Sequence, residues 1–212
     1  MELYPVSRLA AVAEATARSG LDALLLTPGP DLRYVTGYDA TQLERLTCLV
    51  VPASGEPFLV VPRLELPAAE HSPASRLGIE FVAWDETDDP YALVAARLGE
   101  VERVGVADRM WAMQALRLRD AMPRARQELA GRVLRELRMR KSPAEVAALR
   151  EAGAAIDAVH ALVPGFLKPG RTEREVGRDI AAAIVDAGHA TVDFVIVGSG
   201  PNGASPHHEL SD

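Results

Sequence analysis

Two adjacent histidines, His207 and His208, follow a glycine-rich stretch near the end of the chain. Residues 191–197, which precede that stretch, are rich in β-branched and aromatic side chains, and this pattern predicts a buried strand. The glycines and prolines from Gly198 onward end the strand and place the histidines in an exposed loop. Because Pro206 restricts the backbone directly before His207, we expect the chemistry of this protein to lie here.

Three other chemistries are conceivable for the same loop, and each fits its sequence context poorly. Residues 198–203 have the glycine spacing of a dinucleotide-binding fingerprint, but that fingerprint must open a helix, and here Pro206 follows at once. Ser199 does not stand in the G-x-S-x-G context of a serine hydrolase nucleophile. Histidine and carboxylate side chains are present, but neighbours on an extended loop point apart and do not readily share one metal ion.

The composition narrows the class of protein. The 212 residues are 48% hydrophobic and 25% charged, as in ordinary soluble domains, and the net charge of −7 disfavours nucleic acid or an anionic membrane as a partner. No apolar run reaches the roughly 18 residues of a membrane-spanning helix, and the start lacks the pattern of a signal peptide. We therefore predict a cytoplasmic protein. Cys48, the single cysteine, lies in an apolar run and is expected in the core.

Helices and strands alternate over residues 1–130, and this order predicts an α/β domain with a mixed sheet. Two of the strands are separated by Ala-Ser-Gly-Glu, which favours an antiparallel hairpin. The expected strands are residues 21–27, 46–52, 57–62, 79–84 and 101–106, and the expected helices are residues 7–19, 31–37, 90–98 and 110–118.

Between residues 127 and 188, three helical stretches are expected. Residues 127–140 form a basic stretch that we interpret as an interdomain linker, and its arginines could bind an acidic partner, although a solvated face paired with nearby acids is the better expectation. Ser142 and Thr172 are each followed three residues later by glutamate, which is the capping-box signature. They predict two helices, ending near residues 163 and 188.

Taken together, these features resemble the creatinase/prolidase/aminopeptidase P family of metallopeptidases, which cleave the bond before proline. The resemblance rests mainly on "GSGPNGASPHHELSD", with "LRYVTGY" as a second element. It implies an α/β fold with a creatinase-like amino-terminal domain at residues 1–130 and a linker helix at 131–141. Residues 142–212 would then be the first, incomplete part of a pita-bread α+β metallopeptidase domain.

The resemblance also implies roles for individual residues. His207, directly after Pro206, matches the family's substrate-site histidine, whereas His208 does not. Family dimers bring a loop of the amino-terminal domain near the partner's active site, so Asp39 and Arg45 could read the charged ends of a peptide. We expect a homodimer whose full-length form holds two divalent ions, Mn, Co or Zn. The family's metal ligands follow the segment that matches residues 210–212, so no metal is expected on this chain and no residue of it is expected to be catalytic.

Two classes of function remain open. The first is a metal-dependent Xaa-Pro peptidase, a dipeptidase or aminopeptidase acting on proline-containing peptides, with creatinase-type amidinohydrolase as its chemical rival. The second is an inactive relative that binds a protein or peptide. The 212 residues are either a fragment of a longer enzyme or a natural short relative, and alone they are expected to be inactive.

Overall fold

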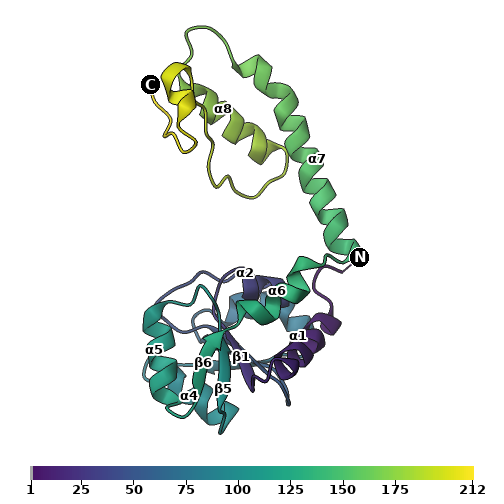
Figure 1. The fold of residues 1–212 in the computed structure, drawn as a ribbon, viewed down its shortest axis with the longest axis vertical. Helices are drawn as coiled ribbons and strands as arrows, with labels where there is room; N and C mark the ends of the chain where they lie inside the picture. The colour runs from purple at the N-terminus through teal and green to yellow at the C-terminus, as the bar shows by residue number, and fades with distance from the viewer. Residues whose placement is uncertain (1) are drawn as a thin grey trace. The chain divides into compact units, whose positions relative to one another are not determined.

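The computed structural model describes residues 2–212 and divides the chain into two compact units, Met1–Lys141 and Ser142–Asp212. Figure 1 colours the first unit purple to teal and the second green to yellow. Each unit is described by itself. None of the helices in residues 2–212 is both long and apolar enough to cross a membrane.

The first unit is built on a mixed sheet, which in the described residues has six strands in the order β4-β3-β2-β1-β5-β6. The β1–β2 and β2–β3 pairs are antiparallel, and the other three pairs are parallel. The strands are β1 Ala23–Leu26, β2 Cys48–Pro52, β3 Phe58–Pro62, β4 Glu80–Trp84, β5 Arg103–Val106 and β6 Arg126–Leu129. The hairpin expected from the short polar loop is confirmed, with Cys48 opposite Val60.

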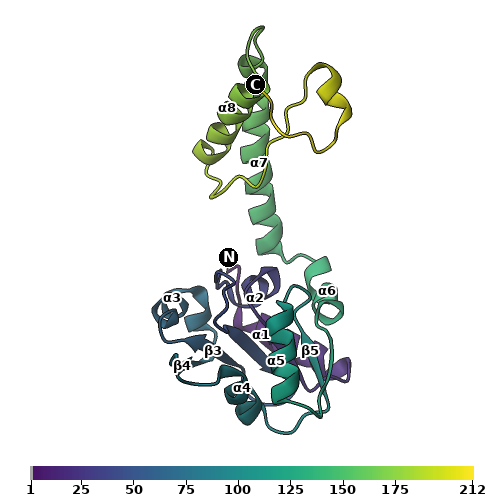
Figure 2. The ribbon, with the colours of Figure 1, turned by 90° about the vertical axis from the view of Figure 1, so that its left-hand side faces the viewer.

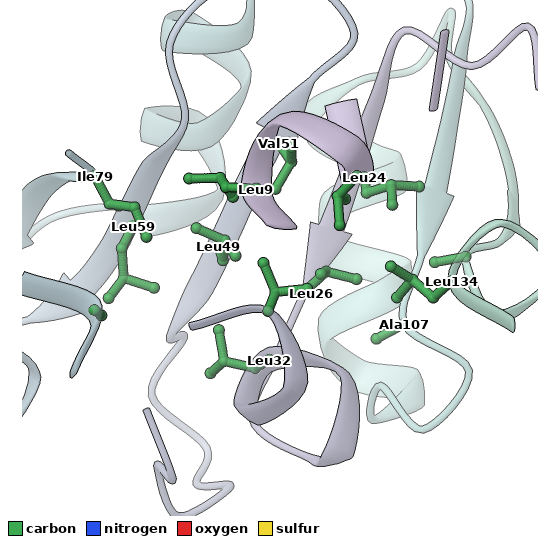
Figure 3. Close-up of a cluster of buried hydrophobic side chains, with 14 of the residues drawn as sticks. Leu9, Leu24, Leu26, Leu32, Leu49, Val51, Leu59, Ile79, Ala107 and Leu134 are labelled. Atoms are coloured by element: carbon green, nitrogen blue, oxygen red, sulfur yellow. The ribbon is translucent and has the colours of Figure 1, made fainter. Parts of the chain in front are cut away.

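Helices cover both faces of this sheet, so apolar side chains on each strand are buried in alternate directions. One face packs against α1 Val6–Arg18, α2 Pro30–Thr36, α3 Leu66–His71, η1 Pro73–Arg76 and α6 Gly131–Met139. Figure 3 shows this core, where Leu9, Leu32 and Leu134 of the helices meet Leu26, Leu49 and Leu59 of the strands. The other face packs against α4 Pro90–Leu98 and α5 Ala112–Ala121 and includes Cys48, which is fully buried as expected.

Residues 126–129 correct one expectation. The basic stretch was expected to be helical from residue 127, but Arg126–Leu129 pairs in parallel with β5 as an edge strand, and α6 begins at Gly131. The strand is defined by its backbone pairing with β5, because three of its four side chains are polar and the fourth, Leu129, is 59% exposed. Helix α6 belongs to the first unit, where Leu134 is fully buried. Two of its arginines pair with acids as expected, Arg132 with Glu128 and Arg138 with Asp31.

The second unit has two helices joined by a turn, α7 Pro143–Phe166 and α8 Glu173–Asp186, and Figures 1 and 2 both show α8 alongside α7. Both capping boxes are confirmed. The Glu145 backbone N–H donates to Ser142 Oγ at 3.2 Å, and the Glu175 N–H donates to Thr172 Oγ1 at 3.2 Å. Helix α7 runs three residues beyond its expected end, with Pro164 inside its last turn.

The expected strand at residues 191–197 is not formed. Within residues 142–212 the structure has no strand, and the irregular segment after α8 contains one short 3-10 helix, η2 Gly200–Ala204. Phe194 is 76% exposed and Ile196 is 41% exposed. A strand needs a neighbouring strand for its backbone hydrogen bonds, and none is present among these residues. The apolar residues at 191–197 therefore do not form a β-strand.

Candidate functional site

The loop that carries the two histidines is held by a single carboxylate at the start of α8. Glu173 is the first residue of that helix, and the residue is only 6% exposed. Thr172 caps the helix and orients its first turn, so Glu173 is placed by local sequence. Its partners, in contrast, all lie 26 to 38 residues further along the chain.

Each oxygen of Glu173 accepts three hydrogen bonds from the loop. Oε1 accepts from the Ser199 backbone N–H at 2.7 Å, from Ser199 Oγ at 3.0 Å and from Asn202 Nδ2 at 3.1 Å. Oε2 accepts from His208 Nε2 at 2.6 Å, from the Ser211 backbone N–H at 3.1 Å and from Ser211 Oγ at 2.7 Å. A carboxylate offers about four lone-pair sites, so this one is saturated.

These donors determine the charge state of Glu173. Hydrogen bonds from the Ser199 backbone and the Ser211 side chain, helped by Asn202 and His208, hold the pKa of the Glu173 carboxyl well below its usual range, although burial acts in the opposite direction. The group is therefore an anion at neutral pH. An ionised carboxylate binds N–H and O–H donors more strongly than a neutral acceptor does.

The end of the loop also lies against the first turns of α8. The Arg174 backbone N–H donates to the Ser211 carbonyl at 3.1 Å, and Arg174 Nε donates to Asp212 at 2.8 Å. A Cβ on Gly177 would come within 2.5 Å of Leu210 Cδ1, so a larger residue there would displace the Leu210 side chain. The last residues of the loop are thus bound to the amino-terminal end of α8.

The two histidines are placed differently. His208 is largely shielded, at 17% side-chain exposure, and is bound to Glu173. His207 is exposed, and within residues 2–212 its side chain has no hydrogen-bond or ion-pair partner. Neither the role of Glu173 nor the anchoring by His208 was predicted from the sequence. A signal was available, because Thr172-Glu-Arg-Glu175 has two acids in one turn and the capping box uses only the second.

Asp39 and Arg45 lie in the first unit. Asp39 is exposed and pairs with Arg33 at 3.1 Å. Arg45 is more enclosed, and its guanidinium lies 3.1 Å from Glu65, 3.6 Å from Glu86 and 3.8 Å from Glu44. A peptide carboxylate would have to compete with these acids for Arg45. That either residue contacts a substrate stays a prediction.

The described residues do not fit a metal centre. Among residues 2–212, no group of three or more histidine, cysteine, aspartate or glutamate side chains could hold a metal ion. At Glu173 the remaining groups around the carboxylate are N–H and O–H donors, which satisfy an anion rather than coordinate a cation.

Comparison with known proteins shows the class. Residues 8–140 match the Creatinase/Prolidase N-terminal domain, and residues 147–212 match metallopeptidase family M24. The chain therefore belongs to the creatinase/prolidase family, with a creatinase-like amino-terminal domain followed by the start of an M24 domain. The resemblance noted in the sequence is confirmed.

Individual relatives sharpen this assignment. The chain is 55% identical over 212 residues to "Probable dipeptidase PepE" of Mycobacterium tuberculosis, covering 100% of this chain and 56% of the relative. The crystal structure of dipeptidase PepE from Mycobacterium ulcerans matches with a TM-score of 0.90 at 55% identity, covering 97% of this chain and 56% of that one. A recombinant prolidase from Thermococcus sibiricus matches with a TM-score of 0.84 at 28% identity, covering 100% and 57%. The chain thus spans little more than half the length of these relatives.

Proposed function

We propose that residues 1–212 are the amino-terminal part of an Xaa-Pro peptidase, a dipeptidase or aminopeptidase that cleaves the bond before proline in peptides. The observation that carries the proposal is the His207 loop. An exposed imidazole without an intramolecular partner stands directly beside a histidine that is bound to a buried carboxylate. The relatives named as a dipeptidase and a prolidase support the same substrate class.

The role proposed for His207 follows from its freedom to donate. When a peptide carbonyl is attacked, negative charge develops on its oxygen, and a hydrogen-bond donor already in place stabilises that charge. His207 can donate to this oxygen without first giving up another partner. His208 cannot do so without leaving Glu173, so it is assigned to the support of the loop.

The remaining parts of the proposal concern the longer protein. We expect it to be a cytoplasmic homodimer that depends on two divalent ions, Mn, Co or Zn, held by residues other than those described. Asp39 and Arg45 would contact the charged ends of the peptide. The 212 residues alone are expected to hydrolyse no Xaa-Pro dipeptide, because residues 2–212 offer no carboxylate cluster for two ions.

Purified full-length protein tests this function. Ala-Pro and Leu-Pro should be cleaved in the presence of Mn²⁺ or Co²⁺, with Ala-Ala as the control dipeptide, and chelation should abolish the activity. His207→Ala should lower kcat/KM about 100-fold or more, and His208→Ala far less, because His207 is the histidine proposed to donate to the substrate. Hydrolysis of creatine without dipeptidase activity would assign the amidinohydrolase alternative. Peptide binding without turnover of either substrate would assign the inactive relative.

A further inference from the structure

We propose that Glu173 is a positioning residue for His207, acting through the loop that it anchors. The inference rests on the proposed function, since it assigns how the substrate-contacting histidine is held. Glu173 itself is not proposed to contact the substrate. The observation behind it is the distribution of the six donors around one buried carboxylate.

The donors lie on both sides of His207. Ser199 and Asn202 precede it by eight and five residues, whereas His208 and Ser211 follow it by one and four. Both backbone N–H donors, from Ser199 and Ser211, converge on the same group. Glu173 therefore joins the two ends of the loop through hydrogen bonds. His207 lies on the part of the loop between these two ends.

Regular structure contributes little to the order of this loop. Between residues 199 and 211 it contains η2 Gly200–Ala204 and otherwise turns and irregular backbone. The residues of η2 are not buried. Ordering such a segment costs about 1–2 kcal/mol per residue in backbone entropy, and apolar burial does not offset that cost here. The hydrogen bonds to Glu173 are the main interactions that hold it.

The hydrogen bond to Glu173 also determines which histidine is available to a substrate. Of the two histidines, His208 makes the 2.6 Å bond to the Glu173 carboxylate. With His208 held against α8, His207 is left exposed. The tandem histidines thus have separate tasks, because His208 fixes the backbone that presents His207.

Substitution of Glu173 by glutamine in the full-length protein is the direct test. Glutamine keeps the size of the side chain but replaces one acceptor oxygen by an NH₂ donor, so three of the six bonds lose their acceptor. We expect kcat/KM for an Xaa-Pro dipeptide to fall about 100-fold, mainly in kcat, since a displacement of about 1 Å in a positioned group can have that effect. Glu175→Gln is the matched control, because glutamine also serves in a capping box and the polar partners of Glu175 are Thr172 and Arg171 rather than loop residues.

A double-mutant cycle distinguishes positioning from a general structural role. If Glu173 acts through His207, the double variant Glu173→Gln/His207→Ala should lie within about two-fold of His207→Ala alone. Losses in kcat/KM that multiply would overturn the proposal. Should Glu173→Gln fail to fold, Ser199→Ala/Ser211→Ala removes two donors and is expected to lower kcat/KM about 10-fold, with Ser205→Ala as its control.

Amide exchange of the same full-length variants gives a readout independent of catalysis. Peptides covering residues 199–211 should exchange faster in Glu173→Gln than in Glu175→Gln, while peptides from α7 remain unchanged. Equal exchange in the two variants would show that Glu173 does not order the loop. If the wild-type protein cleaves no Xaa-Pro dipeptide, the proposed function fails, and this exchange measurement still decides whether the anchoring exists.

Discussion

The two units of this chain are ordered by different interactions. In the first, a sheet is covered by helices on both faces, and every residue of its strands β1, β2 and β3 is buried. In the second, Val159 and Val176 are the buried apolar residues larger than glycine among residues 142–212. Its exposed large apolar residues are Leu149, Leu162, Leu167, Val185, Phe194 and Ile196.

The two units therefore differ in the kind of interaction that stabilises them. Apolar burial stabilises a unit roughly in proportion to the area removed from water, and the first unit has buried leucines on both sides of its sheet. The second unit is held by helix capping and by the hydrogen bonds of Glu173, which define a local geometry but add little apolar burial. A stretch of about 70 residues with so small a core is rarely stable alone.

Hydrogen exchange on the isolated 212-residue chain should show this contrast most strongly. Amides in β1 and β2 should be protected at least about 1,000-fold more than amides in residues 191–197, because core strands open only by global unfolding. Residues 142–212 should become ordered when another polypeptide covers their apolar faces. Strong protection across residues 193–197 in a verified monomer would show instead that the second unit is self-sufficient.

The reactivity of Cys48 measures the integrity of the first unit. Complete burial raises the pKa of the Cys48 thiol to about 12, so the reactive thiolate is scarce and inaccessible at neutral pH. A thiol reagent should modify the native chain at least about 100-fold more slowly than the chain in guanidinium, since reaction requires unfolding. Rapid modification of the native protein would mean that the sheet opens locally.

Matched leucine substitutions sharpen the comparison in energetic terms. Leu26→Ala, in a fully buried strand, should lower the free energy of unfolding of the first unit by about 3 kcal/mol. Leu162→Ala, at a residue that is 52% exposed on α7, should change stability by less than about 0.5 kcal/mol in the isolated chain. Urea denaturation followed by circular dichroism measures both, and similar losses would contradict the assignment of the core.

Acid should affect the Glu173 loop only at low pH. The pKa of Glu173 is depressed in the folded state from an ordinary value of 4.5, so its stabilisation is fully present above that value and is lost as pH falls toward the folded pKa. The charged and titratable groups nearest to it are His208 and the Arg174–Asp212 pair. Order in residues 199–211, followed by exchange in the full-length protein, should be constant from pH 8 to about 5 and decline below about 4. A transition near neutral pH would contradict the assignment of this order to the Glu173 carboxylate.

Local patterns were sufficient for much of the first unit. The β2–β3 hairpin, the helix that begins at Pro90 and the glycine that ends α2 were all expected from turn and capping residues. Each depends on residues close in sequence, where propensity and capping act directly. Edge strand β6 was missed because its pairing with β5 is made by backbone groups and leaves no apolar pattern in Arg126–Leu129.

In the second unit, the sequence alone determined the two capped helices, the glycine-rich loop and the position of His207 after Pro206. Tertiary structure decided that residues 191–197 have no strand partner here and that His208 is bound while His207 is exposed. It also decided that the loop closes on Glu173. These outcomes depend on hydrogen bonds between groups 26 to 38 residues apart, and such pairings are set by how the chain folds back on itself rather than by the spacing of residue types.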